Sequence, residues 1–117
     1  MGKNLINIAL FGLGRIGQMH ADNLIANPNF NLKYIFDIDL KLSKKLSKKY
    51  NCDAIEAPSL AFKDKNIKCI FIASSTATHL KFIEEGAKNK KIIFCEKPLD
   101  LDLKKIKPFL ELHGFKR

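Results

Sequence analysis

Three glycines near the amino terminus have the spacing of a phosphate-binding turn. Gly12, Gly14 and Gly17 form a G-x-G-x-x-G motif between an apolar segment and a segment with helical periodicity. In such a turn the first glycine permits a tight bend, the second lets a pyrophosphate approach the backbone, and the third lets the helix pack close to the strand. Free N–H groups at the helix start also attract phosphates. The motif predicts that a dinucleotide contacts the consecutive residues Gly12, Leu13, Gly14, Arg15 and Ile16.

A carboxylate follows the next apolar segment, where the adenosine ribose of a dinucleotide would lie. Asp37 comes 20 residues after Gly17 and directly after the apolar stretch 32–36. A carboxylate at this distance accepts hydrogen bonds from the ribose hydroxyls and repels a 2′-phosphate. The glycines and Asp37 therefore predict that the cofactor is NAD; NADP, helped by the lysines between 41 and 45, is less favoured. The competing interpretation is a glycine-rich structural turn that binds no ligand.

Apolar periodicity predicts the strands and helices that would position these residues. Expected strands cover 5–11, 32–36, 51–55, 69–73 and 92–95. Expected helices cover 15–26, 40–50 and the segment around 80–87, with one or two helical turns over 59–65 and a further helix from 100 onward that Pro108 kinks. Asp39 is the expected N-cap of the second helix. This alternation predicts an α/β fold, a Rossmann-type, doubly wound and mostly parallel sheet, formed as a single domain over residues 1–117.

The carboxyl ends of the strands in such a sheet share one edge. Ligands bind beyond that edge, at the point where the strand order reverses. Besides the glycine turn and Asp37, the edge would receive the residues that follow two later strands: Ser74, Ser75, Thr76, Glu96, Lys97 and Pro98. We therefore expect four strand ends to converge on one ligand-binding crevice.

Apolar run lengths and cysteine spacing argue against several other classes of protein. No apolar run approaches the ~18 residues that cross a membrane, so no membrane partner is expected. No signal peptide is expected before the first strand. Cys52, Cys69 and Cys95 are odd in number and show no C-x-x-C spacing. Neither a disulfide nor a metal site is therefore expected, and a reducing cytoplasm fits best.

The net charge of +9 is the one unusual total. It would suit a nucleic-acid partner, but no aromatic platform or base-reading motif accompanies the lysines. Lys, Asn, Ile and Phe are all abundant, and all are encoded by A/T-rich codons. We therefore expect a solvated basic surface and no nucleic-acid partner.

Taken together, these motifs resemble those of the glucose–fructose oxidoreductase / inositol dehydrogenase family (Gfo/Idh/MocA). The likeness rests on the glycine turn followed by His20, on Asp37, on the stretch 74–79 (Ser-Ser-Thr-Ala-Thr-His) and on the stretch 95–99 (Cys-Glu-Lys-Pro-Leu). Glu-Lys-Pro after the last strand is the most distinctive part, and the likeness extends to about Ile106. Within the family it is strongest to the inositol 2-dehydrogenases.

The resemblance implies an NAD(P)-dependent oxidoreductase that acts on CH–OH groups of sugars, cyclitols or related polyols. It implies that Lys97 is the catalytic lysine, which would hydrogen-bond the reacting oxygen during hydride transfer. A surface lysine that caps a strand is the alternative. Cofactor contacts are implied for Ser74, Ser75, Thr76, His79, Glu96 and Lys97. A structural role is the alternative for His79, and His20 is expected to pack at the boundary between sheet and helix.

Members of this family continue into a second α/β domain, which carries the substrate pocket and usually an oligomer interface. This sequence ends at Arg117, before such a domain. The resemblance therefore implies the cofactor-binding half of an oxidoreductase, inactive alone, whose polyol or sugar substrate needs the second domain. A stand-alone dinucleotide-binding module without catalysis is the alternative. A homo-oligomer is compatible with both.

Overall fold

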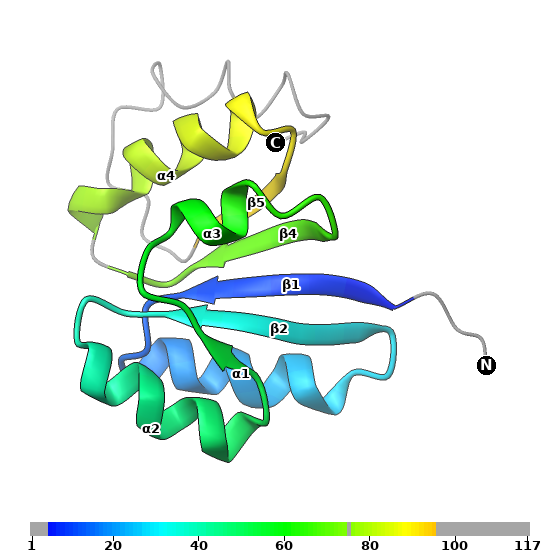
Figure 1. Ribbon diagram of the computed structural model, residues 1–117, viewed down its shortest axis with the longest axis vertical. Helices are drawn as coiled ribbons and strands as arrows, with labels where there is room; N and C mark the ends of the chain where they lie inside the picture. Colours follow the sequence, from blue (N-terminus) through cyan, green and yellow to red (C-terminus); the bar gives the residue numbers. More distant parts are fainter. Residues whose placement is uncertain (1–4, 75, 96–117) are drawn as a thin grey trace.

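One parallel sheet with helices on both faces makes up the described part of the chain (Figure 1). The structure, a computed structural model, describes residues 5–74 and 76–95. Its strands are β1 (Ile6–Phe11), β2 (Phe30–Phe36), β3 (Asp53–Ala54), β4 (Ile67–Ile72) and β5 (Ile92–Cys95). Its helices are α1 (Arg15–Ala26), α2 (Leu40–Tyr50), α3 (Ser59–Phe62) and α4 (Thr76–Lys88). The predicted Rossmann-type α/β fold is confirmed.

The strand order is β3-β2-β1-β4-β5, and every neighbouring pair is parallel. The chain begins in the centre of the sheet, runs outward through β2 to β3, and then crosses back to β4 and β5. As Figure 1 shows, α1 and α2 cover one face, while α3 and α4 cover the other. The order reverses between β1 and β4, so their carboxyl ends flank the crevice where ligands of such sheets bind.

The central strand β1 is buried on both of its faces. Ala9 and Phe11 belong to the core beneath α3 and α4, whereas Ile8 and Leu10 belong to the core beneath α1 and α2. The Phe11 ring meets those of Phe36, Phe62 and Phe82 edge to face, with centroids 5.8, 5.5 and 5.0 Å away. A strand packed on both sides explains the continuous apolar run that predicted it.

Several element boundaries coincide with the sequence prediction, because local signals mark them. The bounds of α1, α2 and β5 are those predicted. Asp39 caps α2 as expected, since its Oδ1 accepts the Leu42 N–H at 3.1 Å. Asn51, at φ 56°, ends the same helix in the left-handed conformation that asparagine tolerates.

The bounds of β2, β3 and β4 differ from the prediction, because pairing with a neighbouring strand determines where each of these strands begins and ends. The predicted strand 51–55 shrinks to the two residues of β3, which pair only with Tyr34 and Ile35. β2 begins earlier than predicted because Phe30 and Asn31 pair with the start of β1. β4 also begins earlier than predicted, at Ile67 and not at Cys69. The helix predicted from 100 onward, with its kink at Pro108, lies outside the described residues.

Candidate functional site

The glycine turn between β1 and α1 is wedged between the carboxyl ends of β2 and β4. The Gly12 N–H donates to the Phe36 carbonyl at 2.8 Å, and the Ala73 N–H donates to the Phe11 carbonyl at 2.7 Å. Gly12 has φ +97°, and a Cβ there would collide with the backbone N of Ser74. Only glycine therefore fits this position, for conformational and for steric reasons.

The other two glycines of the motif differ from each other. A Cβ on Gly17 would collide with the carbonyl oxygen of Gly12, so the fold itself requires a glycine there. A Cβ on Gly14 would meet nothing within 4 Å, and this residue is exposed. Nothing within the described part of the chain thus requires glycine at position 14. A ligand that approaches the backbone closely would require it.

Asp37 is tied to the glycine turn by a direct hydrogen bond. Its Oδ2 accepts the Leu13 N–H at 2.7 Å, and its Oδ1 accepts the Asp39 N–H at 2.9 Å. These bonds hold the half-buried carboxylate at the end of β2. A carboxylate has about four acceptor positions, so both oxygens retain capacity for the hydroxyls of a ribose. The Leu13–Asp37 bond was not predicted, because no sequence spacing reveals it.

A hollow of about 280 Å³ opens beside this turn. Of the predicted site residues, Gly12, Gly14, Asp37 and Ser74 line it. The prediction missed five further lining residues: Phe36, Ile38, Ala73, Thr78 and Phe82. Most of these lie one or two positions from a predicted residue, so adjacency to the strand ends could have indicated them. The hollow lies at the reversal of strand order, as ligand sites in such sheets do.

Three residues of the predicted turn lie beside the hollow and not on its wall. Leu13 is fully buried, and its side chain belongs to the core beneath α1 and α2. Its contribution to a ligand site is therefore confined to its backbone. Arg15 and Ile16 are exposed in the first turn of α1. Backbone N–H groups and the helix dipole at this end favour an anion.

The remaining predicted site residues are described only in part. Thr76 and His79 belong to the first turn of α4. Ser74 precedes this helix, and its Oγ lies 2.6 Å from the Oγ1 of Thr78 within the helix. Ser75, Glu96 and Lys97 lie outside the described residues. His20 lies on the opposite face of the sheet, with its ring centroid 5.9 Å from that of Phe71. This contact fits the packing role expected for His20.

The cysteines offer no nucleophile to this edge of the sheet. Burial raises the pKa of the Cys95 thiol, at the end of β5, to about 12, and that of Cys52 to about 11. Both thiols are therefore protonated near neutral pH and unreactive. In residues 5–74 and 76–95, no group of three His, Cys, Asp or Glu side chains could hold a metal ion. None of the described helices is both long and apolar enough to cross a bilayer.

Comparison with known proteins shows which chains share this arrangement. The family model described as "Oxidoreductase family, NAD-binding Rossmann fold" matches residues 6–113. The chain is 35% identical over 107 residues to myo-inositol 2-dehydrogenase of Thermotoga maritima, and 33% identical over 107 residues to scyllo-inositol 2-dehydrogenase (NAD(+)) of Bacillus subtilis. These matches cover 91% and 90% of this chain.

A solved structure shows the same arrangement in three dimensions. The crystal structure of a myo-inositol dehydrogenase from Corynebacterium glutamicum superposes with a TM-score of 0.81 at 35% identity, covering 95% of this chain and 33% of that one. The chain also spans only 32% and 31% of the two curated relatives. It thus corresponds to about a third of each of these proteins.

Proposed function

Because the chain belongs to the Gfo/Idh/MocA oxidoreductase family and has its NAD-binding Rossmann fold, we propose that it is the cofactor-binding domain of an NAD-dependent polyol dehydrogenase. The substrate class we propose is inositol or a related cyclitol or sugar. The observation that carries the proposal is Gly14, which faces open space where nothing in the described chain requires a glycine. Support for the substrate class comes from the inositol 2-dehydrogenases to which the chain is similar.

In the proposed site the chain binds NAD mainly through its backbone. The turn from Gly12 to Ile16 contacts the pyrophosphate, and Asp37 accepts the hydroxyls of the adenosine ribose. Ile38, which is 89% exposed, offers apolar surface beside the ribose. Ser74, Ser75, Thr76 and His79 are the residues that we propose to contact the cofactor toward its reacting end. NAD, when bound, supplies the hydride acceptor.

Lys97 is the proposed catalytic residue. It follows β5 directly in the sequence, after Cys95 and Glu96, and so follows a strand whose carboxyl end lies at the edge that bears the glycine turn. A cationic donor there would hydrogen-bond the substrate oxygen and stabilise its developing negative charge. Support for this role comes from the Glu-Lys-Pro sequence and its resemblance to the family motif.

The second wall of the substrate site is proposed to lie in a domain that this chain does not span. Hydride transfer needs the substrate carbon held within about 3–3.5 Å of its acceptor. The described residues form one domain and supply the cofactor side of such a site. We therefore propose residues 1–117 as one NAD-binding domain, inactive alone, in a cytoplasmic enzyme that can form homo-oligomers.

A dinucleotide-binding module without catalysis is the second candidate. It would use the same turn and the same carboxylate. The two functions differ in their need for Lys97. A catalytic role makes that lysine indispensable for hydride transfer, whereas a binding module would tolerate its loss.

The proposed cofactor site is tested by replacing Gly14 with valine. We expect Gly14→Val to raise the Kd for NADH about 100-fold, or about 2.7 kcal/mol, because the side chain occupies the approach of the pyrophosphate. The melting temperature should fall only slightly: the new Cβ meets nothing within 4 Å, but valine is a poorer N-cap of α1 than glycine. Fluorescence titration with NADH measures the first quantity and thermal unfolding the second.

The matched control is Ala26→Val, at the exposed far end of the same helix. It introduces the same side chain without touching the turn and should leave NADH binding unchanged. If Gly14→Val bound NADH as tightly as the parent chain, the proposed site would be wrong.

A further inference from the structure

A second hollow, of about 460 Å³, lies at the amino ends of β4 and β5, opposite the glycine turn. Its walls are the loop between α3 and β4 and the turn between α4 and β5. Five of its nine lining residues are lysines: Lys63, Lys65, Lys68, Lys90 and Lys91. The others are Phe62, Ile67, Asn89 and Ile92. We call this feature the basic hollow. No carboxylate is among its described lining residues, so its charge is uniformly positive.

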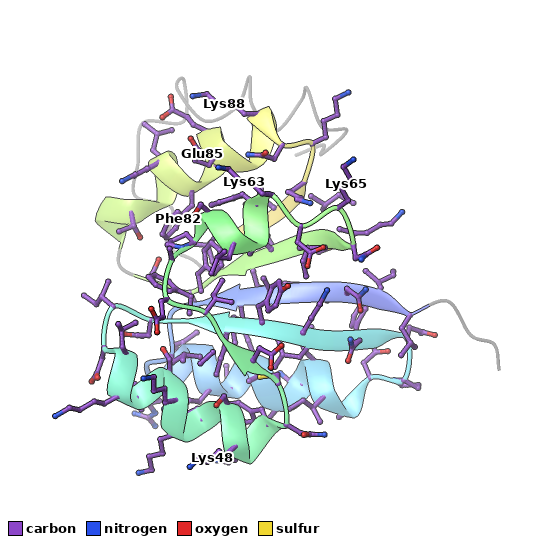
Figure 2. All side chains as sticks on the ribbon, in the orientation of Figure 1. Lys48, Lys63, Lys65, Phe82, Glu85 and Lys88 are labelled. Carbon is purple, nitrogen blue, oxygen red and sulfur yellow. The ribbon has the colours of Figure 1, made fainter. Side chains whose placement is uncertain are left out.

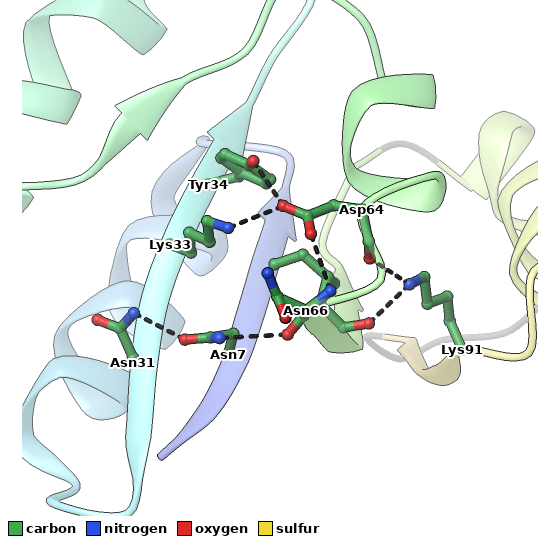
Figure 3. A network of polar contacts seen from close by, with 8 residues as sticks. Asn7, Asn31, Lys33, Tyr34, Asp64, Asn66 and Lys91 are labelled. Carbon is green, nitrogen blue, oxygen red and sulfur yellow. Dashed lines mark hydrogen bonds and ion pairs between the residues drawn. The ribbon is translucent and has the colours of Figure 1, made fainter. Parts of the chain in front are cut away.

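The ammonium group of Lys91 is buried in the wall of the basic hollow. The residue is 5% exposed, and its Nζ donates to the carbonyl oxygens of Asp64 at 2.6 Å and Ile67 at 2.7 Å (Figure 3). Both acceptors are neutral. An ammonium group has three N–H donors, and the third has no acceptor within the described residues. Burial lowers the pKa of Lys91, as expected for a cation removed from water without a carboxylate in contact.

The side-chain carboxylate of Asp64, whose backbone carbonyl accepts from Lys91, is already engaged elsewhere. Asp64 Oδ2 accepts from Lys33 Nζ at 2.8 Å and from the Tyr34 hydroxyl at 2.6 Å. Its Oδ1 accepts the Asn66 N–H at 2.8 Å (Figure 3). The acid therefore braces the loop against β2 and has most of its acceptor capacity in use. Among the described residues no carboxylate contacts the Lys91 ammonium, so an anion from solution is a candidate counter-ion.

The turn that carries Lys90 and Lys91 is held in shape by hydrogen bonds to backbone carbonyls of α4. The Lys91 N–H donates to the Gly86 carbonyl at 2.8 Å, and Asn89 Nδ2 donates to the Glu85 carbonyl at 2.8 Å. Lys90 adopts φ +59°, the left-handed conformation that often ends a helix. The basic hollow is thus preformed, which lowers the ordering cost of binding.

We propose that the basic hollow binds a small anion with several phosphate groups. Lysine ammonium groups act as compact point charges and suit phosphate oxygens, and 460 Å³ lies within the range of small-ligand pockets. Nucleic acid fits less well, because Phe62 is only 3% exposed and cannot stack on a base. The proposal is independent of the cofactor site, which lies at the other end of the strands.

The lysines of α2 provide a matched control surface. Lys44 and Lys48 are exposed on this helix. Figure 2 shows Lys48 across the sheet from Lys63 and Lys65. In contrast to the turn that carries Lys91, this helix buries no lysine. If charge alone attracts polyphosphate, both lysine surfaces should respond equally. If the shape of the basic hollow contributes to binding, only substitution of the lysines that line it should weaken polyphosphate binding strongly.

The experiment is a titration of the chain with inorganic tripolyphosphate, followed residue by residue through amide NMR shifts. We expect saturable shifts at Lys65, Lys68, Lys90 and Lys91. The variant Lys65→Glu/Lys68→Glu should weaken this binding about tenfold or more at low salt. Lys44→Glu/Lys48→Glu, with the same change in net charge, should weaken it less than about threefold.

Three outcomes would overturn the proposal. Shifts confined to the residues around Gly14 would place the anion at the cofactor turn alone. Equal weakening by both double variants would reduce the effect to net charge. Binding of duplex DNA that is tighter than binding of tripolyphosphate, and that shifts the same amides, would make the basic hollow part of a nucleic-acid surface. Unchanged amide spectra of the two variants outside the substituted segments exclude misfolding as the cause.

Discussion

The two ends of the parallel sheet present anions with different kinds of surface. At the carboxyl end, backbone N–H groups and an open glycine face a hollow whose only described charged residue is Asp37. At the amino end, lysine side chains from two separate segments surround the basic hollow. Recognition by backbone needs a special local conformation and so leaves a spacing in the sequence. Recognition by side-chain charge needs only proximity in space, and it leaves no motif.

The two ends also differ in how their charged groups are held. Asp37 is half-buried and bonded to backbone N–H groups of its own strand end and of the glycine turn. Lys91 is buried and hydrogen-bonded to two carbonyl oxygens, one in the loop before β4 and one at the first residue of β4. The first arrangement leaves acceptors for a neutral, hydroxyl-bearing group. The second leaves a cation that lacks a carboxylate in contact.

The largest expected effect on stability concerns Lys91. Lys91→Met should lower the free energy of unfolding by about 2–3 kcal/mol, because two carbonyl oxygens lose their donor. Lys90→Met, at the exposed neighbour, should change it by less than about 0.5 kcal/mol. Urea unfolding measures both values. Equal effects of the two substitutions would show that the buried ammonium does not brace the amino end.

An intermediate effect is expected at the carboxyl end. Asp37→Ala should raise the Kd for NAD about tenfold, or about 1.4 kcal/mol, because the ribose loses an acceptor and the Leu13 N–H loses its partner. Binding of NADP should weaken less, since a repelling charge is also removed. Calorimetric titration with each cofactor gives the ratio of the two Kd values.

Asp53→Ala is the matched control for that ratio. Asp53 is an exposed acid on the edge strand β3, away from the hollow at the glycine turn. This substitution removes the same charge from the chain and should leave the preference for NAD unchanged. A parent chain that binds NADP as tightly as NAD would contradict the role of Asp37.

The smallest expected effect is the acid sensitivity of the amino end. Lys33 and Tyr34 hold the pKa of the Asp64 carboxyl far below its usual range. A lowered pKa in the folded state stabilises the fold above the unfolded value of about 4, and this contribution is lost as pH falls below it. The parent chain should therefore lose on the order of 1 kcal/mol between about pH 5 and pH 2 through Asp64.

Asp64→Asn isolates this contribution. The variant should be less stable than the parent chain at pH 7 and should lose less stability on acidification, as measured by urea unfolding at a series of pH values. Amide exchange in the parent should accelerate first around Asn66, whose N–H donates to Asp64. Identical pH profiles for both chains would show that the Lys33–Asp64 contact is too solvated to matter.

Elements with strong local signals were predicted well from the sequence. Helix α2 has an apolar face at Leu42, Leu46 and Tyr50, a capping aspartate at one end and Asn51 at the other, and its predicted bounds are those observed. Strand β3 was predicted too long, because it lies at the edge and its length depends on pairing with β2. Local signals mark where a helix can begin and end, whereas a neighbouring strand decides how far an edge strand extends.

In the candidate site, too, local sequence signals predicted some residues, whereas others became visible only in the folded structure. The positions of Gly12, Gly14, Gly17 and Asp37 followed from spacing alone. Ile38 was missed although it follows Asp37, because no motif marks it. Thr78 was missed although it belongs to the stretch 74–79 that carries the family resemblance.

The sequence by itself determined the parallel α/β fold, the glycine turn and the carboxylate at the end of β2. It could do so because each depends on residues close together in the chain or on a fixed spacing. Only the tertiary structure decided that the fold requires Gly17 and leaves Gly14 open, and that Asp37 bonds to Leu13. Only the tertiary structure gathered Lys65, Lys68 and Lys91 around one hollow. These features depend on which strands become neighbours, and that is settled when the two faces of the sheet are buried together.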